Sequence, residues 1–258
     1  MALGNRLEDK VAIVTGAGTR GEIAGTGQAA SILMAREGAK ILLCDIDIDR
    51  AEETLNVIEK EGGIGKIFVG DVTSEKDCEA MINESIKQFN KLDILFNNVG
   101  GPGGGMVTEI DEEDWHRAID LSIKSAVMGS KYAIPAMEKS GGGSIINVSS
   151  IDGTQAGSTR NVPYSISKAA ISHLSRIMAV HHGRQNIRVN CVAPGPIRTS
   201  RLDKLSKKNL QKLKNTIPLK RIGEDFEVAD LIYFLASNKS KYISGQSINI
   251  NGGIITER

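Results

Sequence analysis

The feature that most constrains the fold is an alternation of short, continuously apolar runs with segments of helical periodicity. The first run, Val11–Val14, is followed by a helix expected over residues 27–37, and the pattern repeats along the chain. Strands that alternate with helices of this length are typical of βαβ units, which build a parallel sheet. Strand runs without polar alternation are expected where helices cover both faces of the sheet. The sequence therefore predicts an α/β fold.

The expected elements follow one another without a linker or an internal repeat. Further strands are expected at 40–45, 66–69, 92–96, 144–148, 188–193 and 247–250, and further helices at 49–61, 74–89, 114–139, 164–182 and 226–237. We therefore expect one domain over residues 1–258. Ligands of such sheets lie beyond the carboxyl ends of the strands, which is where the unusual polar residues and glycines collect.

Composition argues against several other classes of protein. Lys and Arg number 32 against 31 Asp and Glu, and aromatic residues are 4%, so no nucleic-acid partner is expected. The three cysteines are far apart and no metal-ligand spacing is visible, so we expect neither a disulfide framework nor a metal site. The chain has no run of ~18 apolar residues, and residues 1–10 are mixed polar. We therefore expect no membrane span, no signal peptide and a cytoplasmic protein.

Glycine is in surplus, with 28 residues in 258, and part of the surplus follows the first strand. The loop Thr15-Gly-Ala-Gly-Thr-Arg-Gly-Glu-Ile-Ala-Gly-Thr-Gly27 leads into a helix, where glycines allow a phosphate to approach the helix N-terminus. Such a loop alone is also compatible with a plain tight turn. Asp45, 18 residues after Gly27, is placed to accept ribose hydroxyls and to repel a 2′-phosphate. NAD is therefore favoured, and Arg20 in the loop keeps NADP as the alternative.

A second motif lies near the start of the helix expected at 164–182. Tyr164 and Lys168 share one helix face, and a nearby ammonium lowers the pKa of a phenol, which makes it an acid/base usable near neutral pH. Ser150, at the end of the preceding strand, is placed to hydrogen-bond a substrate oxygen. Such a Tyr/Lys pair alone is more often a solvated helix face. Its position after the fifth strand, together with Ser150, favours a catalytic interpretation.

Together these motifs resemble the short-chain dehydrogenase/reductase family over essentially the whole chain. The matching segments are Thr15-Gly16 with Gly25 and Gly27, Asp71, Asn97-Asn98-Val99-Gly100, Ser150, Tyr164-Ser-Ile-Ser-Lys168, Pro194-Gly195 and Thr199. The resemblance implies a Rossmann-type, doubly wound sheet of seven parallel strands in a three-layer α/β/α domain. It implies a small-molecule substrate, hydride transfer between the cofactor and a secondary alcohol or ketone, and a homotetramer or homodimer.

The resemblance also implies roles for individual residues. Tyr164 is the general acid/base, Lys168 lowers its pKa and holds the nicotinamide ribose, and Ser150 positions the substrate. Asn97 supports the central strand. Cofactor contacts are expected from Gly16, Gly25, Thr26, Gly27, Asp45, Ile46, Asp71, Val72, Asn98, Gly100, Pro194, Gly195, Ile197 and Thr199, in addition to Tyr164 and Lys168.

Three features depart from the family's pattern. The loop between Gly16 and Gly25 is several residues longer than usual. Ser122 stands where the family has an Asn that holds a water behind the lysine, so Ser122 is counted with the catalytic residues. The spacing from Ser150 to Tyr164 is longer by one residue, an insertion within 152–162.

Residues 196–222 are expected to form a lid over the substrate. From Arg198 to Arg221 this segment carries nine basic residues and one acid, Asp203. Its leucines have the spacing of an amphipathic helix, at Leu202, Leu205, Leu210 and Leu213. The charge either attracts an anionic substrate or is a solvated lysine-rich face. Two alternative functions stay open: a 3-oxoacyl-(acyl-carrier-protein) reductase using NADP(H), and a catalytically silent dinucleotide-binding protein.

Overall fold

The sheet of the computed structural model confirms the doubly wound architecture. The structure describes residues 5–19, 24–101, 104–155, 161–199, 202 and 205–255. Seven parallel strands lie in the order β3-β2-β1-β4-β5-β6-β7. They are β1 (Val11–Thr15), β2 (Lys40–Asp45), β3 (Ile64–Val69), β4 (Ile94–Asn97), β5 (Gly143–Val148), β6 (Ile187–Pro194) and β7 (Ser247–Ile250). The strand order reverses between β1 and β4, which opens the carboxyl edge of the sheet at that point.

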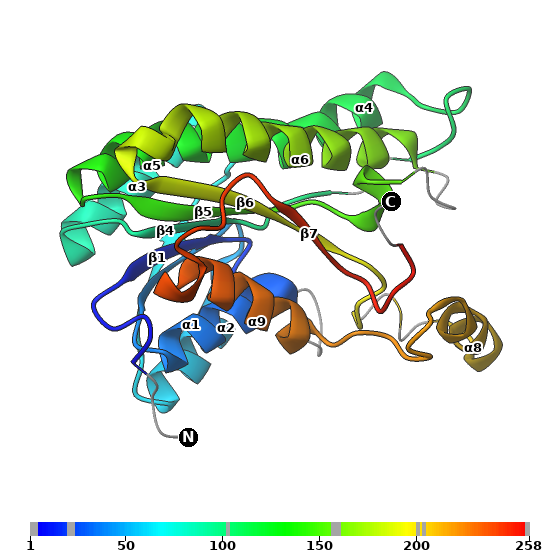
Figure 1. Ribbon diagram of the computed structural model, residues 1–258, viewed down its shortest axis with the longest axis horizontal. Helices are drawn as coiled ribbons and strands as arrows, with labels where there is room; N and C mark the ends of the chain where they lie inside the picture. The colour runs from blue at the N-terminus through cyan, green and yellow to red at the C-terminus, as the bar shows by residue number, and fades with distance from the viewer. Residues whose placement is uncertain are drawn as a thin grey trace.

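Helices cover both faces of the sheet (Figure 1). One face carries α1 (Thr26–Arg36), α2 (Ile48–Lys60) and α9 (Asp225–Ala236), and the other carries α3 (Glu75–Phe89), α5 (Ser125–Lys139) and α6 (Val162–His182). Successive residues of β1 belong to the two opposite cores, Val14 to the first and Ile13 to the second. Both faces of the strand are buried, which explains why its sequence shows no polar alternation.

Short polar side chains fix where several helices begin. Ser74 accepts a hydrogen bond from the Asp77 N–H before α3, as its sequence position predicts. Asn161 accepts one from the Tyr164 N–H, so α6 begins at Val162 rather than at Tyr164. This cap fixes the start of the helix that carries both Tyr164 and Lys168.

The long helix expected over 114–139 consists of three parts. It comprises α4 (Glu112–Ile119), a π-helical turn η1 (Asp120–Lys124) and α5. Each hydrogen bond of a π turn spans one more residue than a hydrogen bond of an α turn, and hydrophobic periodicity does not reveal this difference. Such turns are frequent at functional sites. Here it carries Ser122, which is 2% exposed. The expected lid contains one described helix, α8 (Lys207–Thr216), which projects beyond the helix layer of α1 and α9 (Figure 1).

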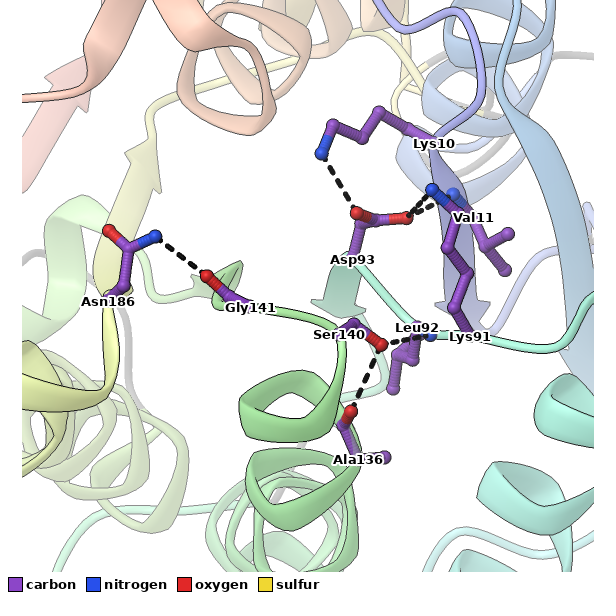
Figure 2. Close-up of polar contacts among 9 residues, drawn as sticks. All are labelled: Lys10, Val11, Lys91, Leu92, Asp93, Ala136, Ser140, Gly141 and Asn186. Atoms are coloured by element: carbon purple, nitrogen blue, oxygen red, sulfur yellow. Dashed lines mark hydrogen bonds and ion pairs between the residues drawn. The ribbon is translucent and has the colours of Figure 1, made fainter.

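At the amino edge of the sheet, a single buried carboxylate joins β1 to β4 (Figure 2). Asp93, 5% exposed, accepts a hydrogen bond from the Val11 N–H at 3.0 Å. It also pairs with the ammonium groups of Lys10 at 2.8 Å and Lys91 at 3.2 Å. Close by, the Ser140 hydroxyl accepts from the Leu92 N–H. These contacts hold the two central strands in register at the edge opposite the candidate site.

Candidate functional site

A cavity of about 610 Å³ opens at the carboxyl edge, where the strand order reverses. It is lined by the loop after β1, the end of β2 and the segments that follow β3 and β4. The predicted cofactor residues that line it are Gly16, Gly25, Thr26, Gly27, Asp45, Ile46, Asp71, Val72, Asn98, Gly100 and Thr199. The cavity is therefore lined by segments that follow strands from both halves of the sheet.

The N-terminus of α1 opens into this cavity. Gly25 is its N-cap and provides no side-chain cap, and the first turn holds no acidic residue. Its first N–H groups and the positive end of the helix dipole are therefore available to an anion. The Asn98 amide donates to the carbonyl oxygens of Thr15 and Gly16 at 3.1 and 3.0 Å, which ties the loop to β4. This cradle fits the pyrophosphate of a dinucleotide.

Two carboxylates, Asp45 and Asp71, also line the cavity. Asp45 accepts from the Gly18 N–H at 2.9 Å and from the Asp47 N–H at 3.1 Å, so its carboxylate is held in one orientation. Asp71 accepts from the N–H and the hydroxyl of Thr73, both at 2.8 Å. Fixed acceptors of this kind suit ribose hydroxyls and an adenine base. The Arg20 of the sequence prediction lies outside the described residues.

Lys168 and Tyr164 lie close together on α6, and Lys168 lies next to Gly100 of the cavity wall, although neither residue lines the cavity itself. The Lys168 ammonium donates to the Val148 carbonyl at 2.8 Å and lies 5.7 Å from the centre of the Tyr164 ring. Lys168 is 4% exposed, and burial lowers its pKa to about 8. A Cβ on Gly100 would lie 2.8 Å from the Lys168 Nζ, so the ammonium lies directly behind this part of the cavity wall.

The two predicted serines are both buried and lie on separate elements. Ser150 is 7% exposed, accepts from the Asp152 N–H, and precedes the short helix η2 (Ile151–Gly153), which packs on α6. Ser122 lies on the π turn, where its hydroxyl would be 3.6 Å from a Cβ on Gly100. Within the described part of the chain this buried hydroxyl has no hydrogen-bond partner. A water is the natural partner for such a group.

Besides Tyr164 and Lys168, three of the predicted cofactor residues do not line the main cavity. Pro194 is the last residue of β6, and the Gly195 N–H bonds to the Ile250 carbonyl at 2.9 Å. Ile197 lines a separate, smaller cavity of about 100 Å³, together with Ile217 and Leu219. These residues lie beside the site at the end of β6.

The structure adds residues that the sequence prediction missed. The Ser149 hydroxyl donates to the Lys168 carbonyl at 2.6 Å and accepts from the Ser172 hydroxyl at 2.9 Å. Asn97 donates to Asn147, which donates to Ser175, forming a buried polar chain across β4, β5 and α6. The Asn within the otherwise apolar run 144–148 was the sequence feature that could have indicated this series of hydrogen bonds. Arg50, from the first turn of α2, also lines the cavity.

The described residues offer little other reactive chemistry. No group of three or more metal-ligating side chains occurs among them. None of their helices has the length and apolar character needed to cross a membrane. The three cysteines are buried, and burial raises the pKa of Cys78 to about 11 and that of Cys44 further still.

Comparison with known proteins agrees with this geometry. A family model for enoyl-(acyl carrier protein) reductases matches residues 21–255. The 7alpha-hydroxysteroid dehydrogenase of Escherichia coli K12 is 37% identical over 256 residues, covering 98% of this chain and 96% of that one. The 3-oxoacyl-(acyl-carrier-protein) reductase of Thermotoga maritima is 35% identical over 252 residues, covering 97% and 99%.

The likeness extends to three dimensions. The solved structure of a 7 alpha-hydroxysteroid dehydrogenase, complexed with NADH and 7-oxo glycochenodeoxycholic acid, matches with a TM-score of 0.89 at 37% identity and covers 96% of this chain and 95% of that one. The chain belongs to the short-chain dehydrogenase/reductase family and is a nucleotide-binding oxidoreductase.

Proposed function

We propose that this oxidoreductase transfers a hydride between NAD(H) and a secondary alcohol or ketone, with Tyr164 as the general acid/base. The observation that carries the proposal is the buried Lys168 ammonium beside the Tyr164 ring, directly behind Gly100, which lines the same cavity as Asp45. A cation next to a phenol favours the phenolate. A carboxylate at the ribose end favours NAD over NADP.

Each residue has a separate task in the proposed reaction. The bound dinucleotide supplies or accepts the hydride at the substrate carbon. During reduction Tyr164 donates its phenolic proton to the substrate oxygen, and during oxidation its phenolate removes the hydroxyl proton. Ser150 hydrogen-bonds the same oxygen, and Lys168 holds the nicotinamide ribose and stabilises the phenolate.

We assign Ser122 a supporting task in proton supply. Its buried hydroxyl, unpaired among the described residues, lies near the Lys168 ammonium across Gly100. A water held there would accept a hydrogen bond from the ammonium and connect it to solvent. In this proposal the π turn of η1 serves to present Ser122 to the site.

The decisive experiment replaces Tyr164 by Phe. The phenol oxygen is lost while the ring and the cavity stay, so turnover should fall by about 10²-fold or more whereas the dissociation constant of NADH stays within a few-fold. Turnover is measured by nicotinamide absorbance with a panel of secondary alcohols and ketones, and binding by calorimetry. Full activity of Tyr164→Phe would refute the assignment.

The substrate panel also tests the two alternatives. A 3-oxoacyl-(acyl-carrier-protein) reductase is favoured by the relative from Thermotoga maritima and by the lysines of α8, which have no acidic partner among the described residues. Hydroxysteroids are the first alcohols to test, because the other named relatives act on them. A catalytically silent dinucleotide-binding protein would bind NADH and turn over nothing in the panel.

The remaining assignments concern the whole chain. We propose that residues 1–258 act as one domain, that 196–222 closes over the substrate as a lid, and that the protein is cytoplasmic and forms a homotetramer or homodimer. The lid proposal is supported by α8, whose residues are all at least partly exposed. The oligomer proposal is supported by apolar side chains exposed on α6.

A further inference from the structure

Lys168 is held at both of its ends by two consecutive residues at the end of β5. Its ammonium donates to the Val148 carbonyl at 2.8 Å, and its main-chain carbonyl accepts from the Ser149 hydroxyl at 2.6 Å. The next residue is Ser150, the proposed substrate contact. One short segment therefore binds Lys168 at both ends and also carries the serine that would bind the substrate.

Gly153, in η2, packs directly on the main chain of Lys168 from the segment that follows Ser150. A Cβ at Gly153 would lie 2.5 Å from the Lys168 carbonyl carbon and 2.8 Å from the carbonyl oxygen. An approach this close requires a residue without a side chain. Ser149 and Gly153 therefore contact the same peptide group, and both lie within three residues of Ser150.

The Ser149 hydroxyl belongs to a buried polar cluster that reaches the edge of the sheet. Ser172, one turn after Lys168 on α6, donates to Ser149 at 2.9 Å, and its hydroxyl lies 3.4 Å from that of Ser247 on β7. Ser149 and Ser172 are 2% and 5% exposed. The Cys191 sulfur lies 3.9 Å from the Ser172 hydroxyl, and burial raises the pKa of this thiol, so it brings no charge to the cluster. Buried hydrogen bonds of this kind hold groups in one arrangement.

We propose that Ser149 and Gly153 are positioning residues, which set where the Lys168 main chain, and with it the ammonium and the Tyr164 ring, stands relative to Ser150. This inference rests on the proposed reaction. The ammonium has a neutral partner, the Val148 carbonyl, so it stays there only while α6 keeps its distance from the end of β5. A displacement of reacting groups by about 1 Å is enough to slow catalysis about 10²-fold.

Replacing Ser149 by Ala removes the hydroxyl and leaves the Lys168 carbonyl with one hydrogen-bond donor fewer. Turnover should fall about tenfold or more, whereas the substrate KM and the NADH dissociation constant stay within a few-fold. The pH profile of alcohol oxidation should move to higher pH, because an ammonium that is held less closely stabilises the Tyr164 phenolate less. Ser149→Thr keeps the hydroxyl and should restore turnover to within a few-fold of the wild type.

Gly153→Ala tests the same peptide group from its other side. The new methyl group has to push the Lys168 main chain away, because backbone atoms would lie closer to it than real Cβ contacts allow. This variant removes no hydrogen-bonding group. It should nevertheless produce the same pattern as Ser149→Ala, with lower turnover and a pH profile that moves to higher pH.

Ser144→Ala is the matched control. Ser144 also lies on β5, is also 2% exposed, and donates to a helix carbonyl, that of Leu235, at 2.9 Å. Its replacement should lower the thermal midpoint about as much as Ser149→Ala does, and should leave turnover and the pH profile unchanged. Hydrogen exchange without cofactor gives a readout that does not depend on activity. The amides of residues 164–172 should exchange faster in Ser149→Ala and not in Ser144→Ala.

The outcomes separate this inference from the proposed function. If Ser149→Ala loses no more turnover than Ser144→Ala, or keeps the wild-type pH profile, the inference is wrong and the proposed function stands. A folded Ser149→Thr that is as slow as Ser149→Ala would also overturn it. If the wild type turns over nothing in the substrate panel, the proposed function fails, and the exchange of residues 164–172 still decides whether Ser149 holds this part of α6.

Discussion

Lys168 has a buried ammonium whose pKa depends on the folded structure. Burial lowers that pKa from its ordinary value of 10.5 to about 8. Between those two pH values the unfolded chain binds a proton that the folded chain does not, so the Lys168 contribution to the free energy of unfolding increases with pH. At neutral pH the buried charge therefore destabilises the fold, by an amount on the order of 3 kcal/mol.

Replacing Lys168 by Met tests this cost against the proposed catalytic role. Met fills a similar volume without a charge, so at pH 7 Lys168→Met should unfold at an equal or higher urea concentration than the wild type. Turnover should fall by about 10²-fold or more. The stability advantage of the variant should shrink as the pH is raised from 7 to 9.5, because the wild type loses its buried charge. An advantage that grows with pH would contradict the assigned direction of the pKa shift.

The sequence could predict candidate site residues that are close to one another along the chain or that lie at the end of a strand. Tyr164 and Lys168 are one helical turn apart, and Asp45 ends a strand that faces the cavity. Ser149 was not predictable, because its partner, the Lys168 carbonyl, is brought to it by the packing of α6 on the sheet. The same holds for Arg50, because only tertiary structure places the first turn of α2 beside the glycine loop.

At the scale of the element, helix and strand types were predictable while several boundaries were not. The strand expected at 66–69 begins at Ile64, because Ile64 and Gly65 pair with Lys40 and Ile41 of β2. Of the leucines of the expected lid, Leu210 and Leu213 lie on α8, which begins at Lys207, where Ser206 accepts from the Asn209 N–H. Pairing partners and caps, rather than hydrophobic periodicity, set these boundaries.

Asp93 is expected to contribute to the stability of the central strand pair without affecting the site. Asp93→Ala leaves the buried Val11 N–H unpaired and should lower the free energy of unfolding by about 2 kcal/mol in urea titrations. Lys10→Ala is the matched control: its side chain is 36% exposed, so its loss should cost only about 0.5 kcal/mol. NADH affinity should be unchanged in both variants, because the cavity lies at the opposite edge. Equal effects of the two variants on stability would contradict this account.

At the scale of the molecule, the outward face of α6 exposes several large apolar side chains, which is unusual for a helix face that contacts only water. Ile166, Ile177 and Val180 are 44%, 40% and 80% exposed, and their spacing places them along one side of the helix. Because apolar side chains gathered in this way are typical of contact surfaces, we expect this face to take part in the proposed oligomer. The alternating pattern predicted an α/β fold and the family resemblance implied the doubly wound topology, but this face could be identified only once the buried side of α6 was known.

This face predicts the effect of a charge on assembly. Val180→Glu should shift the protein towards smaller species in light scattering coupled to size exclusion, because a carboxylate would have to be buried without a partner. Ile64→Glu is the control, since Ile64 is 51% exposed on the edge strand β3, away from α6. An unchanged mass for Val180→Glu, or the same loss for Ile64→Glu, would place the contact surface elsewhere.

Side chains from one short stretch of sequence connect β1 and β4 at both edges of the sheet. Asp93 connects them at the amino edge and Asn98 at the carboxyl edge, and the cavity lies directly beyond Asn98. A dinucleotide in that cavity would contact segments from both halves of the sheet and would be a third connection between them. Its binding energy would then oppose the parting of the two halves, so a loaded enzyme would resist proteolysis as one unit.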